Sequence, residues 1–533
     1  MPTGGQALVR TLEEMGVRIC FGLPGVHNLP AWEALRGSSV RLVGVRHEQT
    51  AVYAADGDAR VTGELGVALT TTGPGAANAL GATGEAWASG SPVLVIATDI
   101  PTTLRRPGVY RGVLHETRDQ GAMFAPVVKE VVRVGSADEI GEAVARAAAT
   151  ARAAPAGPVY LEIPTDLLRA PATIGDSYVP QDVQVARSPD EAAELCAAAD
   201  RPLLWVGGGA KDAGEGIAAL ATALGAPVIE TYSARGVLDP SHPSWLGLPP
   251  HLPEVGALWD DADLVVTVGS DLDGMMTQNF AQPQPPRMVA LNVDAADAGK
   301  NYAVDVVVEG DAAETAPALA EALPGGAEPP SLAALRSAAL QRLRETEPAG
   351  VAFLDAMEDA LDEDTVVFAD MCIPGYWLAS MHPFARPRRL AYPVGWGTLG
   401  FAFPASIGAA LAQDDPVLCV CGDGGFMFAA GELAAVAQER APLTILVVDD
   451  GGYGMLRYDQ HKAGTEPYGV DLATPDWNQL AGAFGIECEE AEVGAGLADV
   501  VRRRLASKGP SLVVARTELP PPPSTSPRWY RRA

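Results

Sequence analysis

The sequence predicts an α/β protein of three successive domains, each with a mostly parallel sheet covered by helices. The chain has 533 residues, which is too long for a single hydrophobic core. Short apolar runs alternate with segments of helical spacing along most of the chain, and this alternation is typical of parallel sheets. Pro-rich stretches without periodicity interrupt the pattern. We therefore expect domains at residues 1–170, 190–323 and 332–519, and a Pro-rich tail at 520–533.

Each predicted strand is an apolar, β-branched run bounded by turn residues. In the first domain, a helix over 7–15 is followed by strands at 18–21, 41–45, 66–70 and 92–97. In the second domain, the runs predict strands at 202–206, 227–230, 264–268 and 288–292. In the third domain, they predict strands at 365–369, 416–421, 443–448 and 511–515, with a helix over 429–440. A strand followed by a helix and another strand indicates parallel pairing in all three domains.

Composition excludes several classes of partner. Hydrophobic residues make up 48% and charged residues 20%, as in ordinary folded proteins. The net charge of -29 repels nucleic acid and anionic lipid, so neither is expected as a partner. Neither a signal peptide nor an apolar run of membrane-spanning length is recognisable, which predicts a cytoplasmic protein. The six cysteines are scattered and are expected to be core thiols.

Two aspartates follow neighbouring strands of the third domain. Gly422-Asp423-Gly424-Gly425 ends one apolar run, and Asp450 follows the next run 27 residues later (450 − 423), which is room for one helix and one returning strand. Both carboxylates should therefore reach the same edge of the sheet. Mg²⁺ prefers such oxygen ligands together with phosphate oxygens, and a carbonyl near Gly452 could complete its shell. The alternative is a pair of ordinary Asp/Gly turns.

This pair resembles the cofactor motif of the thiamine-diphosphate-dependent superfamily that includes acetolactate synthase, pyruvate decarboxylase and benzoylformate decarboxylase. The likeness runs from Phe21-Gly22-Leu23-Pro24-Gly25 to Leu456 and keeps the order of three domains. It implies thiamine diphosphate and Mg²⁺ as cofactors, with Asp423, Asp450 and Gly452 around the metal. The family usually has Asn where this chain has Asp450, which adds negative charge beside a diphosphate.

The resemblance also implies roles for residues outside the metal motif. Glu48, in Arg46-His47-Glu48-Gln49, matches the family's cofactor-activating glutamate; the alternative is a glutamate that stabilises a helix N-terminus. Leu399 matches a residue that wedges under the cofactor, unless it is a core leucine. The further cofactor contacts that the resemblance implies are Gly73, Asn78, Gly397, Thr398, Gly422, Gly424, Gly425, Tyr453, Gly454 and Met455. Gly73 and Asn78 could equally belong to an ordinary glycine turn.

The substrate-facing segments resemble the decarboxylase branch that acts on 5-guanidino-2-oxopentanoate. The residues expected near the substrate are Val26, His27, His115 and Glu116. His115 could shuttle a proton, a common role of imidazole side chains, or it could be a loop histidine that caps backbone groups. Gln120, like His115, is expected to be a catalytic residue. A guanidinium substrate could pair with Glu116.

We therefore predict decarboxylation of a small-molecule 2-oxo acid through an enamine. The alternatives are an acetolactate synthase-type carboligase, and a non-catalytic homologue in which Asp450 marks a damaged metal site. FAD in the middle domain is possible but not favoured, because Met275 stands where the synthases have an arginine. The family splits its cofactor site between subunits, so the resemblance implies a homodimer or homotetramer.

Overall fold

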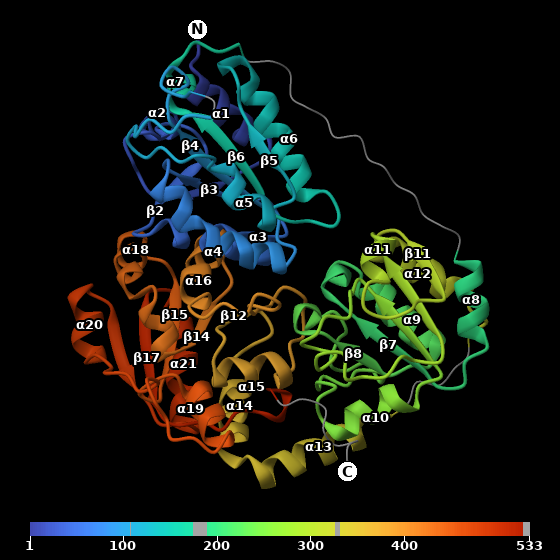
Figure 1. Ribbon diagram of the computed structural model, residues 1–533. Helices are drawn as coiled ribbons and strands as arrows, with labels where there is room; N and C mark the ends of the chain where they lie inside the picture. The colour runs from blue at the N-terminus through green and yellow to red at the C-terminus, as the bar shows by residue number, and fades with distance from the viewer. Residues whose placement is uncertain (107, 174–188, 326–330, 526–533) are drawn as a thin grey trace.

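The computed structural model describes residues 1–106, 108–173, 189–325 and 331–525. Three parallel sheets follow one another along the chain, each flanked by helices (Figure 1), which confirms the predicted fold class. The first domain packs directly on the third, and the middle domain lies beside them. Most of the expected linkers and the end of the tail (174–188, 326–330 and 526–533) lie outside the described residues.

The first sheet has six parallel strands, because every strand returns through a helical crossover. In sheet order they are β2 (Arg41–Gly44), β1 (Ile19–Gly22), β3 (Gly66–Thr70), β4 (Val93–Asp99), β6 (Val159–Pro164) and β5 (Val131–Arg133). The helices of this domain are α1 (Gly4–Glu14), α2 (Leu29–Leu35), α3 (Glu48–Thr62), α4 (Pro74–Ala88), α5 (Gly121–Phe124), α6 (Ile140–Arg152) and α7 (Thr165–Arg169). The central strands are fully buried, which explains their continuous apolar runs.

The middle sheet has five parallel strands. Their order is β11 (Val306–Glu309), β10 (Met288–Asn292), β9 (Leu264–Val268), β7 (Pro202–Val206) and β8 (Val228–Glu230). The helices are α8 (Asp190–Ala197), α9 (Gly214–Leu224), α10 (Pro253–Asp261), α11 (Ala295–Ala298) and α12 (Ala312–Ala322).

The third sheet repeats the topology of the first. Its order is β13 (Leu390–Ala391), β12 (Val366–Ala369), β14 (Val417–Gly422), β15 (Leu443–Asp449), β17 (Ser511–Arg516) and β16 (Glu487–Glu490). The helices are α13 (Ala333–Thr346), α14 (Pro348–Ala360), α15 (Ile373–Met381), α16 (Ala402–Ala412), α17 (Asp423–Met427), α18 (Leu433–Glu439), α19 (Gly454–Lys462), α20 (Trp477–Ala483) and α21 (Ala495–Ala506). Gly422 pairs with Val448, so the chain leaves β14 and β15 at the same edge.

The first and third domains meet through helices α3 and α16. A Cβ on Gly57 of α3 would collide with the Ala405 carbonyl, and one on Gly408 of α16 would collide with the Ala54 carbonyl. Only glycine allows the two backbones to come this close. The interface is therefore a close backbone contact that fixes the first domain relative to the third.

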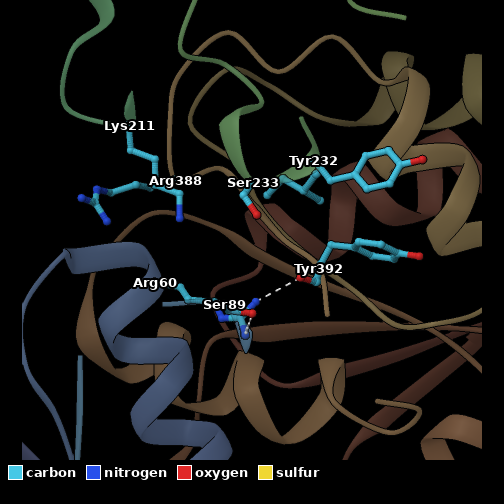
Figure 2. Close-up of a pocket in the computed structure, with 8 residues that line it drawn as sticks. Arg60, Ser89, Lys211, Tyr232, Ser233, Arg388 and Tyr392 are labelled. Atoms are coloured by element: carbon cyan, nitrogen blue, oxygen red, sulfur yellow. Dashed lines mark hydrogen bonds between the residues drawn. The ribbon is translucent and has the colours of Figure 1, made fainter. Parts of the chain in front are cut away.

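Three cations line a small cavity where the three domains meet. Figure 2 shows Arg60 of α3, Lys211 of the middle domain and Arg388 of the third domain around it. Arg60 pairs with Asp56 at 2.8 Å, whereas no described carboxylate lies within ion-pair distance of the Lys211 amino group. Burial, and then the nearby Arg388 and Arg60, lower the pKa of Lys211 to about 8. Arg60 also pairs with Glu85 at 3.2 Å, and Arg388 pairs with Asp212 at 2.8 Å, so Lys211 is the one of the three cations without an ion-pair partner among the described residues.

The beginning of the predicted tail packs against the third domain. The Trp377 indole N–H donates to the Pro520 carbonyl at 2.8 Å, and Ser524 is buried. Cys20, Cys196, Cys419 and Cys421 are buried, but Cys372 and Cys488 are only partly so, which corrects the expectation of six core thiols. Among the described residues, the structure has no helix long and apolar enough to cross a membrane.

Candidate cofactor and substrate site

The carboxyl ends of β14 and β15 bring Asp423 and Asp450 to one cavity. Both carboxylate oxygens of Asp423 and Oδ1 of Asp450 are buried, with no hydrogen-bond partner in the described part of the chain. Burial raises the pKa of each group to about 6, and the charge of Asp450 is the second cause for Asp423. Arg457 forms a long ion pair with Asp450 at 4.0 Å, and no ion pair to Asp423 is found in the described part of the chain. Buried carboxylate oxygens without hydrogen bonds are costly, so this arrangement fits a cation ligand.

The glycines around these carboxylates allow the backbone to approach a ligand. A Cβ on Gly424 would lie 2.7 Å from the Tyr453 ring, and one on Gly425 would collide with the Asp370 carboxylate. The cavity has a volume of about 200 Å³. The predicted residues that line it are Leu399, Gly422, Asp423, Gly424, Gly425, Asp450, Gly452, Tyr453, Gly454 and Met455. Two predicted contacts, Gly397 and Thr398, are not among its lining residues.

The donor set fits a magnesium diphosphate. Within the described residues, no group of three or more His, Cys, Asp or Glu side chains is placed to hold a metal alone. Mg²⁺ is typically held by one or two carboxylates and by the phosphates of its ligand, with water in the remaining positions. Asp423 and Asp450 match that requirement, and the N-terminus of α17 offers backbone N–H groups beside them.

Asp370 holds the loop that carries Leu399, and the sequence analysis missed it. It follows β12, is fully buried, and accepts hydrogen bonds from the Gly400 N–H at 2.9 Å and the Phe401 N–H at 3.1 Å. Burial raises its pKa to about 6. An acidic residue directly after a predicted strand was the available signal. The neighbouring Thr398 turns the other way, because its hydroxyl donates to Glu85 at 2.8 Å.

Glu48 begins helix α3 in the first domain. Its carboxylate is buried and accepts a hydrogen bond from the Asn78 amide at 2.9 Å, so the structure brings these two predicted residues together. A third-domain carboxylate, Glu432, accepts from the Arg46 N–H at 3.0 Å and so fixes the chain just before Glu48. No local motif indicated Glu432, because its contact spans the two domains.

Two predicted histidines lie side by side in the first domain. The ring centroids of His27 and His115 are 5.3 Å apart in an edge-to-face arrangement. Burial, and then the nearby His115, lower the pKa of His27. His115 has a positive φ of 65°, and its carbonyl lies against Gly73. The pair therefore adjoins the glycine turn that was predicted to contact the cofactor.

The other predicted substrate and catalytic residues make mainly structural contacts. Gln120 accepts from the Gly73 N–H at 2.6 Å and donates to the Thr98 carbonyl at 2.9 Å, so its amide is occupied and positions the turn. Glu116 accepts from the N–H groups of Arg111 and Val113, both at 2.9 Å, and these bonds lower its pKa. Val26 is 54% exposed.

The two groups of site residues do not share a cavity within one chain. The described residues that line the Asp423 cavity all belong to the third domain. Glu48, Asn78 and the histidine pair belong to the first domain. The residues predicted for the site therefore form two separate groups within one chain.

Three parallel α/β domains, with a cavity in the third whose carboxylates and glycines fit a magnesium diphosphate, are typical of a thiamine-diphosphate-dependent enzyme. The family models for thiamine pyrophosphate enzymes match the N-terminal TPP binding domain at residues 2–123, the central domain at 189–319 and the C-terminal TPP binding domain at 372–515. The chain belongs to this family of thiamine pyrophosphate, or thiamine diphosphate, enzymes.

Named relatives narrow the class of reaction. The chain is 36% identical over 531 residues to "Probable 2-ketoarginine decarboxylase AruI" of Pseudomonas aeruginosa, covering 96% of this chain and 94% of that protein. It is 32% identical over 529 residues to "Acetolactate synthase" of Mycobacterium bovis (92% and 84%). It is 28% identical over 551 residues to "Probable acetolactate synthase large subunit" of Methanocaldococcus jannaschii (96% and 91%). The chain is thus an enzyme of the decarboxylase or carboligase type, and not a non-catalytic homologue.

Proposed function

We propose that the enzyme decarboxylates a 2-oxo acid and releases the aldehyde. In this reaction the bond between the carboxylate and the carbonyl carbon breaks, CO₂ leaves, and one proton replaces it on that carbon. The similarity to the Pseudomonas aeruginosa protein named as a 2-ketoarginine decarboxylase supports this reaction and suggests a long, basic 2-oxo acid as a substrate. The similarity to acetolactate synthases keeps carboligation as the alternative.

The third domain would hold the cofactor through its metal. Asp423, Asp450 and the Gly452 carbonyl are our proposed Mg²⁺ ligands, and Gly424 and Gly425 would bring backbone N–H groups to the diphosphate. When bound, thiamine diphosphate supplies a carbon nucleophile and an electron sink for the electrons left by CO₂. Leu399 would support its rings from below.

Glu48 would exchange a proton with the pyrimidine ring of the cofactor. The Asn78 amide donates to the Glu48 carboxylate and holds it in one orientation. Glu432 fixes the backbone before Glu48 from the third domain, which makes Glu432 a positioning residue. Such a fixed orientation is needed because a general acid must first lie within hydrogen-bond reach of the atom with which it exchanges a proton.

The observation that carries the decarboxylase proposal is the histidine pair. His27 and His115 place two imidazoles 5.3 Å apart beside the glycine turn of the first domain. One of them could deliver the proton that replaces CO₂, and the lowered pKa of His27 makes its protonated form the stronger proton donor. We propose His115 as the residue that faces the substrate.

We further propose that the active enzyme is a homodimer, or a homotetramer built from such dimers. Glu48 and the histidines of one subunit would face the Asp423 cavity of the other. The separation of these residues into two groups within one chain supports this assembly. Symmetric pairing would give two equal sites per dimer.

Product analysis tests the reaction. The enzyme, loaded with thiamine diphosphate and Mg²⁺, is incubated with pyruvate and with longer 2-oxo acids, including 5-guanidino-2-oxopentanoate. We expect one aldehyde and one CO₂ for each acid consumed. A hydroxyketo acid such as acetolactate as the dominant product would contradict the proposal and favour the carboligase.

A further inference from the structure

A larger cavity of about 900 Å³ continues from the cofactor cavity into the middle domain. Met371, Tyr376, Met455 and Leu456 line both cavities, so the two spaces adjoin. A substrate whose reacting carbon lies at the cofactor would extend its far end into this space. The side chains that line this cavity should therefore select which 2-oxo acids bind.

Carboxylates outnumber cations in this cavity. Asp271, Asp273 and Asp459 line it, and Lys300 is the one lysine or arginine among its described lining residues. Lys300 is already paired with Asp271 at 2.7 Å. Asp459 is an exposed residue that lines the cavity, and it has no ion pair in the described part of the chain. An anionic tail would be repelled here, and a cationic tail attracted.

Two buried side chains of the cavity wall carry unused hydrogen-bond acceptors. His251 is 8% exposed and its Nε2–H donates to the Met275 carbonyl, which leaves Nδ1 without a partner. Burial lowers the pKa of His251 to about 4, so the ring is neutral and Nδ1 is an acceptor. Gln278 is 4% exposed; its amide N–H donates to the Pro250 carbonyl, and Oε1 has no described partner.

Three tyrosines, Tyr232 of the middle domain and Tyr376 and Tyr392 of the third, form an aromatic wall of the cavity. The ring centroids of Tyr232 and Tyr392 are 5.5 Å apart, and those of Tyr376 and Tyr392 are 6.5 Å apart. Figure 2 shows the hydroxyls of Tyr232 and Tyr392 pointing to the same side. All three rings line the cavity. Aromatic faces attract cations, and guanidinium groups stack on them.

We propose that this cavity binds the guanidinium-type cation at the far end of the 2-oxo acid, with Asp459 as its ion-pair partner. A guanidinium has five N–H donors and no acceptor, which complements a wall of carboxylates, free acceptors and aromatic rings. Helix α19 begins at Gly454 beside the metal loop, and its rise of about 1.5 Å per residue places Asp459 about 7.5 Å further on. The inference rests on the proposed decarboxylation.

This assignment replaces Glu116, which the sequence suggested as the guanidinium partner. The Glu116 carboxylate already accepts two backbone N–H groups of its own loop in the first domain. The surplus of carboxylates also disfavours an anionic dinucleotide such as FAD in the same cavity. Asp459 is thus the specificity residue that the structure indicates.

Steady-state kinetics on two matched substrates test the inference. The substrates are 5-guanidino-2-oxopentanoate and its uncharged ureido analogue, which has nearly the same shape. We expect Asp459→Asn to lower kcat/KM about tenfold for the guanidino acid and less than about twofold for the ureido acid. The control is Asp414→Asn, which removes an exposed carboxylate outside the cavity and should change neither value.

The outcomes separate this inference from the proposed reaction. An equal effect of Asp459→Asn on both substrates, or no effect on either, would overturn the guanidinium subsite. A wild-type enzyme that decarboxylates uncharged acids but shows no preference for the guanidino acid would overturn it as well. Failure to decarboxylate any 2-oxo acid would instead overturn the proposed function itself.

Discussion

If Asp423 and Asp450 are both Mg²⁺ ligands, as we propose, the second carboxylate should make magnesium binding unusually sensitive to pH. Asp423 and Asp450 each have a pKa raised to about 6, first by burial. Both must be deprotonated to bind the metal, so affinity is present above pH 6 and lost as the pH falls through that value. At pH 5 each carboxylate is charged in about one molecule in ten. We therefore expect the affinity for Mg²⁺ to fall about 100-fold between pH 8 and pH 5.

Asp450→Asn should make this pH dependence shallower. The Asn amide does not titrate. Removing the negative charge of Asp450 also lowers the pKa of Asp423, because that charge is the second cause that raises it. We expect the affinity of the variant to fall by no more than about tenfold over the same range. Calorimetric titration with Mg²⁺ at saturating thiamine diphosphate, between pH 8 and pH 5, measures the Mg²⁺ affinity of the wild type and of the variant. The diphosphate of the cofactor also titrates, but it does so equally in both proteins, so the difference between their pH dependences reports on Asp450. Equal pH dependences would refute the reasoning.

Three further substitutions test separate parts of the structure. Lys211→Met should stabilise the protein by about 1–3 kcal/mol at pH 7, because the folded pKa of about 8 lies below the unfolded value of 10.5. The gain should shrink as the pH rises from 8 to 10.5, so a pH-independent change in Tm would contradict it. Leu399→Ala should lower kcat about tenfold without changing Mg²⁺ affinity, since we propose that its side chain supports the cofactor and not the metal; equal loss of both would place Leu399 in the metal site. Glu432→Ala should free the Arg46 N–H, displace Glu48 and lower kcat about tenfold, again at constant Mg²⁺ affinity. Unchanged kcat would remove Glu432 from the site.

The sequence predicted every interior strand except β6 at Val159–Pro164, which is buried but was not predicted, and it missed most of the edge strands. β3 at Gly66–Thr70 and β9 at Leu264–Val268 are covered on both faces, so their apolar runs mark their bounds. β16 at Glu487–Glu490 was missed because it is an edge strand with three acidic residues. β13 has two residues and is defined only by pairing with β12. Such strands depend on a neighbour and leave little local pattern.

The candidate site was predicted where its residues are close in sequence or follow strands. Asp423 and Asp450 could be paired because parallel strands end at one edge. Asp370 was missed because its partners are the N–H groups of a loop 30 residues away. Gln120 was expected to be catalytic, but the fold uses its amide to hold Gly73. Thr398 was expected at the cofactor, but its hydroxyl binds Glu85; in both cases a tertiary contact decides where the side chain points.

The most direct test of the account is complementation between two inactive variants. Glu48→Gln and Asp423→Asn chains are produced separately and together, and each preparation is assayed for decarboxylation. If each site combines Glu48 of one subunit with Asp423 of the other, a mixed dimer keeps one intact site, and random pairing should restore about a quarter of wild-type activity. If mixed dimers form, as shown by differently tagged subunits that copurify, and activity stays at the level of the single variants, the shared site is wrong.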